Sequence, residues 1–202
     1  VYNEAASLPT LLAEAEAALR ELAPVEVVLV NDGSTDASLA VMEGLRRQYP
    51  QLGIRIVCLD RNHGLTTAMD AGFHAARGEV FVTIDADLQN DPADIPKLVS
   101  YLKDFDIAIG SRVSRRDKLV KRLSSRIANG IRNWATHEDI RDVACSLKAY
   151  RPEFVRRLKL YNGLHRFLPT LLKLEGARVV EVPVNHRPRR YGVAKYHLFN
   201  RL

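Results

Sequence analysis

The fold of this chain is decided by the stretch Val80-Phe81-Val82-Thr83-Ile84-Asp85-Ala86-Asp87-Leu88-Gln89-Asn90-Asp91-Pro92. Its first five residues favour β structure and carry no charge, a pattern that predicts a buried strand. The predicted strand runs directly into two carboxylates, Asp85 and Asp87, and then into the turn signal Asn-Asp-Pro. In open α/β sheets, ligands bind outside the carboxyl ends of the strands, so both carboxylates are expected at a binding site.

The two aspartates also indicate a divalent metal site. A bend after Asp85 would turn the carboxylates of Asp85 and Asp87 toward one hard cation. Ligation by oxygen alone suits Mg²⁺ or Mn²⁺, above all an ion that also holds the phosphates of a substrate. The alternative is a solvated polar loop, because a bare Asp-x-Asp is common in proteins. The motifs around it favour the metal site.

The rest of the chain alternates apolar runs with helical patterns. We expect helices over residues 7–22, 36–49, 65–76 and 93–103, and strands over 25–30, 54–59, 80–84 and 106–110. After residue 111 we expect a long basic helix, a short strand over 146–150, helices near 152–158 and 165–174, and a strand over 177–184. This alternation predicts an α/β fold with a mostly parallel central sheet covered by helices on both faces.

Length and composition indicate one domain. A chain of 202 residues with 47% hydrophobic content can bury a substantial core. Its two cysteines, Cys58 and Cys145, lie far apart and suggest no disulfide framework, which favours a reducing compartment. No apolar run approaches the roughly 18 residues that would cross a bilayer. The sequence starts without Met and ends abruptly at Leu202, so we expect a natural protein that is longer at both ends.

Polar motifs also stand at the other predicted strand ends and helix starts. The sequence Asn-Asp-Gly-Ser-Thr-Asp at 31–36 follows a strand, so that Asp32 lies at the strand end and Gly33 permits a tight turn. Tyr2-Asn3-Glu4 precedes a helix, where Tyr2 and Glu4 would contact a nucleotide, or would simply belong to a ragged terminus. The sequence Asn-His-Gly at 62–64 is interpreted as a plain turn.

Six short motifs follow one another along nearly the whole chain, at residues 2–4, 31–36, 85–89, 110–112 (Gly-Ser-Arg), 142–148 (Asp-Val-Ala-Cys-Ser-Leu-Lys) and 189–196 (Arg-Arg-Tyr-Gly-Val-Ala-Lys-Tyr). In this order they resemble the signatures of family 2 glycosyltransferases. The chain is most similar to the dolichol-phosphate mannosyltransferase-like, or polyisoprenyl-phosphate glycosyltransferase, branch. The resemblance implies the GT-A fold, a Rossmann-like fold that binds nucleotide-sugars.

The resemblance also implies roles for individual residues. Asp32 would contact the base, while Asp85 and Asp87 would hold the diphosphate through Mg²⁺ or Mn²⁺, with a further metal contact from Gln89. The implied nucleotide-sugar-binding set is Tyr2, Glu4, Asp32, Asp85, Ala86, Asp87, Arg112, Arg189 and Lys195. The catalytic candidates are Asp87, Arg112 and Asp142.

The chain departs from the family pattern at two points. The family has a strand and a proline before the position of Tyr2, and a chain that began at Val1 would have a gap in the middle of its sheet. Ala194 stands where the family usually has serine, which removes one hydroxyl near the phosphates. The expected role of Lys195 is unaffected by this difference.

The second half of the chain is expected to bind the acceptor. Between residues 112 and 132 there are eight basic residues against one acid, Asp117. Apolar residues recur there at near-helical intervals, at Leu119, Leu123, Ile127, Ile131 and Trp134. This pattern predicts an amphipathic helix around 116–134 that lies on a membrane surface, or else a solvated helix that packs its apolar stripe on the domain. Residues 1–111 would then bind the nucleotide-sugar, and 112–202 would face the acceptor and the cytoplasmic face of the membrane.

Charge suggests how such an enzyme would work. The metal would neutralise the leaving nucleoside diphosphate, while Arg112 and a second cationic clamp of Arg189 and Lys195 would meet phosphates. A polyisoprenyl phosphate acceptor is already an anion, so in-line attack with inversion needs no general base. Asp142 would then orient Arg112, a lysine or a sugar hydroxyl. For a hydroxyl acceptor, Asp142 or the pair Glu138-Asp139 would have to act as the base.

Several alternatives stay open at this point. A soluble family 2 enzyme that glycosylates a glycan hydroxyl would share the first half and would not need the basic helix. A basic module that binds phosphate or nucleic acid fits the pI of about 9.5, although no RNA-binding signature or zinc spacing supports nucleic acid. A processive polysaccharide synthase is disfavoured because Gln-x-x-Arg-Trp is absent from the sequence, and a nicotinamide dehydrogenase because no Gly-x-Gly-x-x-Gly follows any strand.

Overall fold

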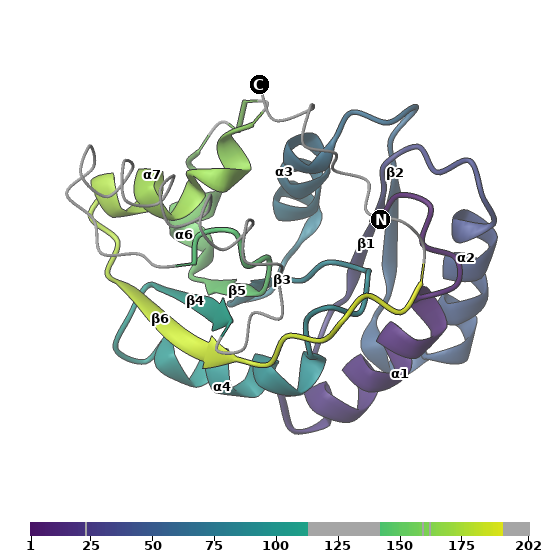
Figure 1. The fold of residues 1–202 in the computed structure, drawn as a ribbon, viewed down its shortest axis with the longest axis horizontal. Coiled ribbons are helices and arrows are strands. Elements are labelled where there is room, and N and C mark those ends of the chain that lie inside the picture. The colour runs from purple at the N-terminus through teal and green to yellow at the C-terminus, as the bar shows by residue number, and fades with distance from the viewer. Residues whose placement is uncertain (23, 113–141, 159, 162, 192–202) are drawn as a thin grey trace.

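The computed structural model describes residues 1–22, 24–112, 142–158, 160–161 and 163–191 (Figure 1). The predicted basic helix around 116–134, the pair Glu138-Asp139, and the residues Ala194 and Lys195 lie outside these ranges. The helices are α1 (Leu8–Leu19), α2 (Ser38–Gln48), α3 (Leu65–Ala75), α4 (Ile95–Tyr101), α6 (Pro152–Val155) and α7 (Leu168–Leu174). Short 3-10 helices are η1 (Arg20–Leu22), η2 (Pro50–Leu52), η3 (Pro92–Asp94) and η4 (Leu164–Arg166). The strands are β1 (Val28–Asn31), β2 (Arg55–Cys58), β3 (Phe81–Thr83), β4 (Ile107–Arg112), β5 (Lys148–Tyr150) and β6 (Val179–Val184).

The strands of the described residues form two sheets. β1 pairs with β2 in parallel, with Val28 opposite Arg55 and Asn31 opposite Cys58. The second sheet has the order β3-β5-β4-β6, in which β4 and β6 are parallel. β5 lies antiparallel between β3 and β4, and it is the strand that departs from the parallel arrangement. The α/β class is as predicted, and the position of β5 in the sheet is what the order of elements along the chain did not reveal.

A groove of about 2030 Å³ is lined by both β1 and β3, which belong to different sheets. The first residue lies beside β1, because the amino group of Val1 donates to the carbonyl of Val30 at 2.7 Å and the N–H of Asp32 donates to the carbonyl of Val1 at 2.8 Å. Among the described residues, no strand pairs the two sheets with each other. The same groove extends past the end of β3 to Asp85 and Asp87.

Helices cover both faces of the four-stranded sheet because its strands alternate their side chains. In β4, Ile107 and Ile109 are buried with Phe81 and Tyr150 against the layer of α3, α6 and α7 (Figure 1). The intervening Ala108 is buried on the opposite face, in a cluster that contains residues of α4. A third cluster joins α1 and α2 to β1 and β2. Helix α3 packs against both sheets, because its Phe73 lies in the first cluster and α3 also contacts β1 and β2.

The two cysteines behave as expected from their spacing, since both are free, with Cys58 exposed and Cys145 buried. Among the residues that the structure describes, no helix combines the length and the apolar character needed to cross a membrane.

Candidate functional site

The turn after β3 carries Asp85 and Asp87 and is fixed by a buried leucine. Leu88 has a φ of 62°, in the left-handed region that side chains other than glycine rarely adopt. Such a backbone costs roughly 1–3 kcal/mol and persists only where the surrounding structure enforces it. Here the side chain of Leu88 is 1% exposed and packs in the cluster of α1, α2 and β1. The N–H of Gln89 donates to Asp87 Oδ1 at 3.0 Å, so the backbone of the turn orients the Asp87 carboxylate.

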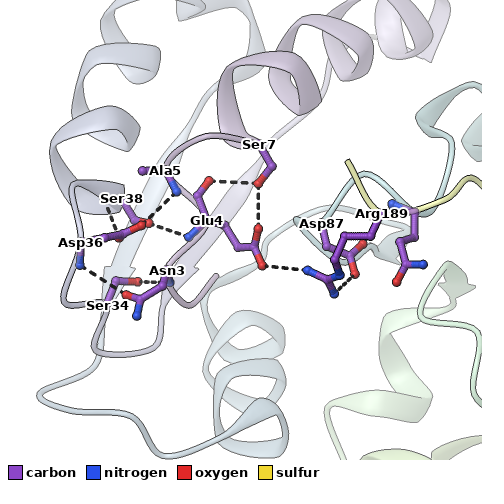
Figure 2. Close-up of polar contacts among 10 residues, drawn as sticks. Asn3, Glu4, Ala5, Ser7, Ser34, Asp36, Ser38, Asp87 and Arg189 are labelled. Atoms are coloured by element: carbon purple, nitrogen blue, oxygen red, sulfur yellow. Dashed lines mark hydrogen bonds and ion pairs between the residues drawn. The ribbon is translucent and has the colours of Figure 1, made fainter. Parts of the chain in front are cut away.

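Asp87 forms an ion pair with an arginine from the far end of the chain (Figure 2). Arg189 Nη2 lies 2.6 Å from Asp87 Oδ2, and Arg189 Nη1 lies 3.5 Å from Glu4 Oε1. The hydroxyl of Ser7 donates to Glu4 Oε2 at 3.0 Å, which fixes the second carboxylate. Burial raises the pKa of Asp87, and the neighbouring charge of Asp85 raises it further, while the Gln89 amide and Arg189 lower it. The carboxylates of Glu4, Asp85 and Asp87 therefore repel one another, and a bound cation would relieve this repulsion.

The segment that carries Arg189 is anchored by its neighbour. Arg187 Nη1 lies 2.7 Å from Glu14 Oε2 on α1, and Arg187 Nη2 lies 2.6 Å from Asp91 Oδ2. The N–H of Arg187 donates to the carbonyl of Gln89 at 2.8 Å. These contacts bind the segment that carries Arg189 to α1 and to the turn after β3.

Asp32, at the end of β1, is buried and accepts hydrogen bonds from the turn that follows β2. Its Oδ1 accepts from the N–H of His63 at 2.8 Å. Its Oδ2 accepts from the N–H of Gly64 at 3.0 Å and from Asn62 Nδ2 at 3.1 Å. The sequence Asn-His-Gly at 62–64 is therefore more than the plain turn that we expected, because it fixes the orientation of the Asp32 carboxylate.

Gly33 makes this approach of the two loops possible. It has a φ of 63°, and a Cβ built at this position would lie 2.2 Å from the carbonyl carbon of Arg61. No other residue type fits without movement of backbone, because the atoms that would clash belong to the main chain.

The loops at residues 2–4 and 31–36 are joined by hydrogen bonds (Figure 2). The N–H of Asn3 donates to Ser34 Oγ at 3.0 Å, and the N–H of Thr35 donates to Asn3 Oδ1 at 2.8 Å. Asp36 Oδ2 accepts from the N–H of Ala5 at 3.2 Å. The segment Tyr2-Asn3-Glu4 is therefore ordered against the end of β1, and Tyr2 and Glu4 line the same groove as Asp32.

Arg112 and Asp142 form a bidentate ion pair at the end of β4. Arg112 Nε lies 2.7 Å from Asp142 Oδ2, and Arg112 Nη2 lies 2.8 Å from Asp142 Oδ1. The N–H of Arg112 also donates to Asp142 Oδ2 at 3.2 Å. Asp142 is itself held by its own N–H, which donates to Glu181 Oε1 on β6 at 2.8 Å. Arg112 is thus one of the expected partners of Asp142 that the structure brings into contact with it.

One groove is lined by most of the residues that the sequence singled out. They are Tyr2, Glu4, Asp32, Asp85, Ala86, Asp87, Gln89, Arg112 and Arg189. Asp142 contacts this set through its ion pair with Arg112. Lys195 lies outside the described residues. In the part of the chain that the structure describes, no group of three or more His, Cys, Asp or Glu side chains is arranged to hold a metal ion. The oxygens of Asp85, Asp87 and Gln89 nevertheless suit a hard cation that takes its remaining ligands from phosphates or water.

Sequence reasoning missed two residues of this region. Arg187 anchors the Arg189 segment, but its partner Glu14 is 173 positions away, so no local pattern announced the contact. Lys148 lines the groove and is buried. Its signal was present in the period-2 alternation of residues 146–150, which puts Lys148 on the same face of β5 as Tyr150.

Comparison with known proteins decides the family. The profile of Glycosyl transferase family 2 matches residues 1–159. The chain belongs to this family.

Two curated relatives carry names that combine a polyprenyl phosphate with a sugar. The chain is 39% identical over 205 residues to dodecaprenyl-phosphate galacturonate synthase of Rhizobium johnstonii, covering 97% of this chain and 60% of that protein. It is 37% identical over 200 residues to undecaprenyl-phosphate 4-deoxy-4-formamido-L-arabinose transferase of Yersinia enterocolitica, covering 98% of this chain and 61% of that protein. The family 2 chain thus spans about three-fifths of the length of these relatives.

Solved structures share the fold. The mannosyltransferase PcManGT of Pyrobaculum calidifontis, in complex with GDP-Man and Mn²⁺, has a TM-score of 0.70 at 19% identity, over 91% of this chain and 52% of that one. Glucosyl-3-phosphoglycerate synthase of Mycobacterium tuberculosis, in complex with Mn²⁺ and UDP-glucose, has a TM-score of 0.71 at 18% identity, over 96% of this chain and 70% of that one. The chain has the GT-A fold that its sequence motifs predict.

Proposed function

We propose that this chain is the catalytic unit of an inverting, metal-dependent glycosyltransferase that moves a sugar from a UDP- or GDP-sugar onto a polyisoprenyl phosphate. The observation that carries the proposal is the meeting of carboxylates and arginines in one groove. Asp85 and Asp87 follow β3, Arg112 ends β4, and Arg189 pairs with Asp87. Alternating charges of this kind suit a diphosphate held between a cation and guanidinium groups.

Residues 1–111 would form the donor side of the site. The metal ligands would be Asp85, Asp87 and Gln89, and the ion would be Mg²⁺ or Mn²⁺. The solved GT-A structures that contain Mn²⁺ or Mg²⁺ with UDP, UDP-glucose or GDP-Man support a divalent ion. When bound, the ion supplies positive charge that neutralises the leaving diphosphate. Arg189 would turn from Asp87 to the diphosphate.

The nucleoside would lie over the loops that the N-terminal segment joins. Asp32, fixed by the turn at 62–64, would contact the base, and Tyr2, Glu4 and Ala86 would line the nucleotide and sugar positions. Lys195 would complete the cationic clamp.

Residues 112–202 would form the acceptor side, at the cytoplasmic face of a membrane, with the basic segment around 116–134 at the surface. The curated relatives support a polyisoprenyl phosphate as acceptor. Such an acceptor is an anion at neutral pH, so positioning by Arg112 would replace general-base catalysis. Asp142 would fix the Arg112 guanidinium through the two parallel hydrogen bonds of 2.7 and 2.8 Å.

A thermal-shift panel of UDP- and GDP-sugars, with and without Mn²⁺, tests the donor side, because a ligand that binds only the folded protein raises Tm. We expect one donor class to stabilise the protein in a Mn²⁺-dependent manner, and Asp87→Ala to lose that dependence. The matched control is Asp104→Ala, an exposed aspartate beyond α4. Unchanged donor affinity and Mn²⁺ response in Asp87→Ala would refute the proposed donor site.

The acceptor side is tested by sugar transfer to polyisoprenyl phosphate in anionic vesicles, together with co-sedimentation of the protein. Transfer to the lipid phosphate and binding to vesicles are the expected results. If the protein stays in the supernatant while the vesicles sediment, and if it glycosylates a glycan hydroxyl instead, the soluble alternative is favoured.

A further inference from the structure

Lys148 is a lysine buried in the four-stranded sheet. It is the first residue of β5, opposite Thr83 of β3 and Ile109 of β4. It is only 4% exposed. Across the described ranges of the chain, its ammonium makes neither a hydrogen bond nor an ion pair. Burial of a charged group without a partner destabilises a protein, so such a lysine is rarely kept for folding alone.

The strand register sets the direction of this side chain. In the antiparallel pairing, Phe81 lies opposite Tyr150 and Thr83 lies opposite Lys148. Tyr150 and Phe81 pack with Phe73 of α3, so Lys148 belongs to this same face of the sheet. Lys148 is two residues from Tyr150, nearer to the ends of β3 and β4 that lead to the groove. There it lines the groove together with Asp85 and Arg112.

The charges near Lys148 do not neutralise it by contact. Asp142, which attracts the ammonium, is already bonded to Arg112 through both carboxylate oxygens. Burial lowers the pKa of Lys148 most, the charges of Cys145, Asp85 and Asp142 raise it, and Arg112 lowers it. Arg112 and Lys148 are thus two cations at neighbouring strand ends of one groove, and an anion between them would relieve their repulsion.

We propose that Lys148 is a substrate-binding residue whose ammonium donates a hydrogen bond to a phosphate oxygen in the reaction centre. The inference rests on the proposed function and names a contact that the family motifs did not assign. Both substrates of the proposed reaction carry the required group, the donor in its diphosphate and the acceptor in its lipid phosphate. A neutral sugar hydroxyl would not offset the buried charge, whereas a phosphate oxygen forms a strong charge-assisted hydrogen bond.

The test uses Lys148→Met, which keeps the length and apolar stem of the side chain and removes its charge. Lys148→Arg restores a cation, and Lys103→Met, at an exposed lysine beyond α4, is the matched control. Loss of one hydrogen bond to a charged group is expected to weaken binding by about 10- to 100-fold. The affinity for UDP and GDP with Mn²⁺, measured calorimetrically, reports the donor diphosphate. The KM for a short-chain polyisoprenyl phosphate reports the acceptor phosphate.

A stability measurement separates a binding role from a structural one. If the ammonium serves to bind phosphate, Lys148→Met should unfold without ligand at an unchanged or higher urea concentration than the wild-type protein. One of the two affinities should fall in Lys148→Met, and Lys148→Arg should recover part of it. A fall in nucleotide affinity identifies the donor diphosphate, and a rise only in the KM for the acceptor identifies the lipid phosphate. A destabilised Lys148→Met with both affinities intact overturns the inference. Absence of transfer by the wild-type protein would instead contradict the proposed function itself.

Discussion

Replacement of Arg189 with glutamine is expected to strengthen Mn²⁺ binding in the absence of nucleotide. Arg189 pairs with Asp87 at 2.6 Å, and their side chains are only 24% and 11% exposed. A metal ion that binds Asp87 must first displace this guanidinium. A partly buried hydrogen bond between charged groups contributes about 1.5–3 kcal/mol, and each 1.4 kcal/mol corresponds to a factor of about ten. We therefore expect the Kd for Mn²⁺ to fall by roughly tenfold or more in Arg189→Gln.

With a nucleotide present, the expected effect has the opposite sign. Arg189 is then free to contact the diphosphate, so Arg189→Gln should bind UDP or GDP with Mn²⁺ more weakly than the wild-type protein. Isothermal titration calorimetry with Mn²⁺ alone and with Mn²⁺ plus nucleotide measures both quantities. Arg190→Gln, at an exposed neighbouring position, controls for the loss of one positive charge. An unchanged or weaker affinity for Mn²⁺ alone in Arg189→Gln would refute the idea that Arg189 and the metal compete for Asp87.

Three further outcomes are expected. Asp142→Asn should lower the transfer rate by roughly 10- to 100-fold, because Arg112 loses a charge-assisted bidentate partner, and the pH–rate profile should show no general-base limb; such a limb would point to a hydroxyl acceptor. Gly33→Ala should destabilise the protein by about 2 kcal/mol or more in urea unfolding, because its Cβ meets the Arg61 backbone at a positive φ; an unchanged midpoint would contradict this. Burial raises the pKa of Asp87 in the folded protein, so its ionised form costs stability above that pKa, and metal-free Asp87→Asn should melt at a higher temperature than wild type near neutral pH. That advantage should shrink as the pH falls through the raised pKa, and an advantage that persists in acid would contradict the assignment.

Much of the donor side was predictable because its chemistry is local in the sequence. The apolar run before Asp85 predicts a buried strand, and the turn signal after Asp87 predicts where it ends. Strand ends that carry Asp32, Asp87 and Arg112 then converge for a general reason, since strands of an α/β sheet deliver their ends to shared edges. The structure brings all three to one groove.

The contacts that fix these side chains were not predictable because their partners are distant in sequence. Asn-His-Gly at 62–64 is an ordinary turn signal, and nothing local indicates that its N–H groups bind Asp32, which is about 30 positions earlier. Period-2 alternation indicates which face Lys148 occupies, but whether that face is core or groove depends on the pairing of β5 between β3 and β4. Order along the chain does not determine order in a sheet, so this antiparallel insertion could be learned only from the fold.

Leu88 is one of the residues that join the two sheets of the molecule. The carboxylates around it follow β3 of the four-stranded sheet, while its own side chain is buried with α1, α2 and β1. The positions of Asp85 and Asp87 therefore depend on how the two sheets pack against each other, and a shift between the sheets would move both carboxylates. Variants that reinforce the packing of Leu88 between the two sheets should therefore retain nucleotide binding to a higher temperature than the wild-type protein.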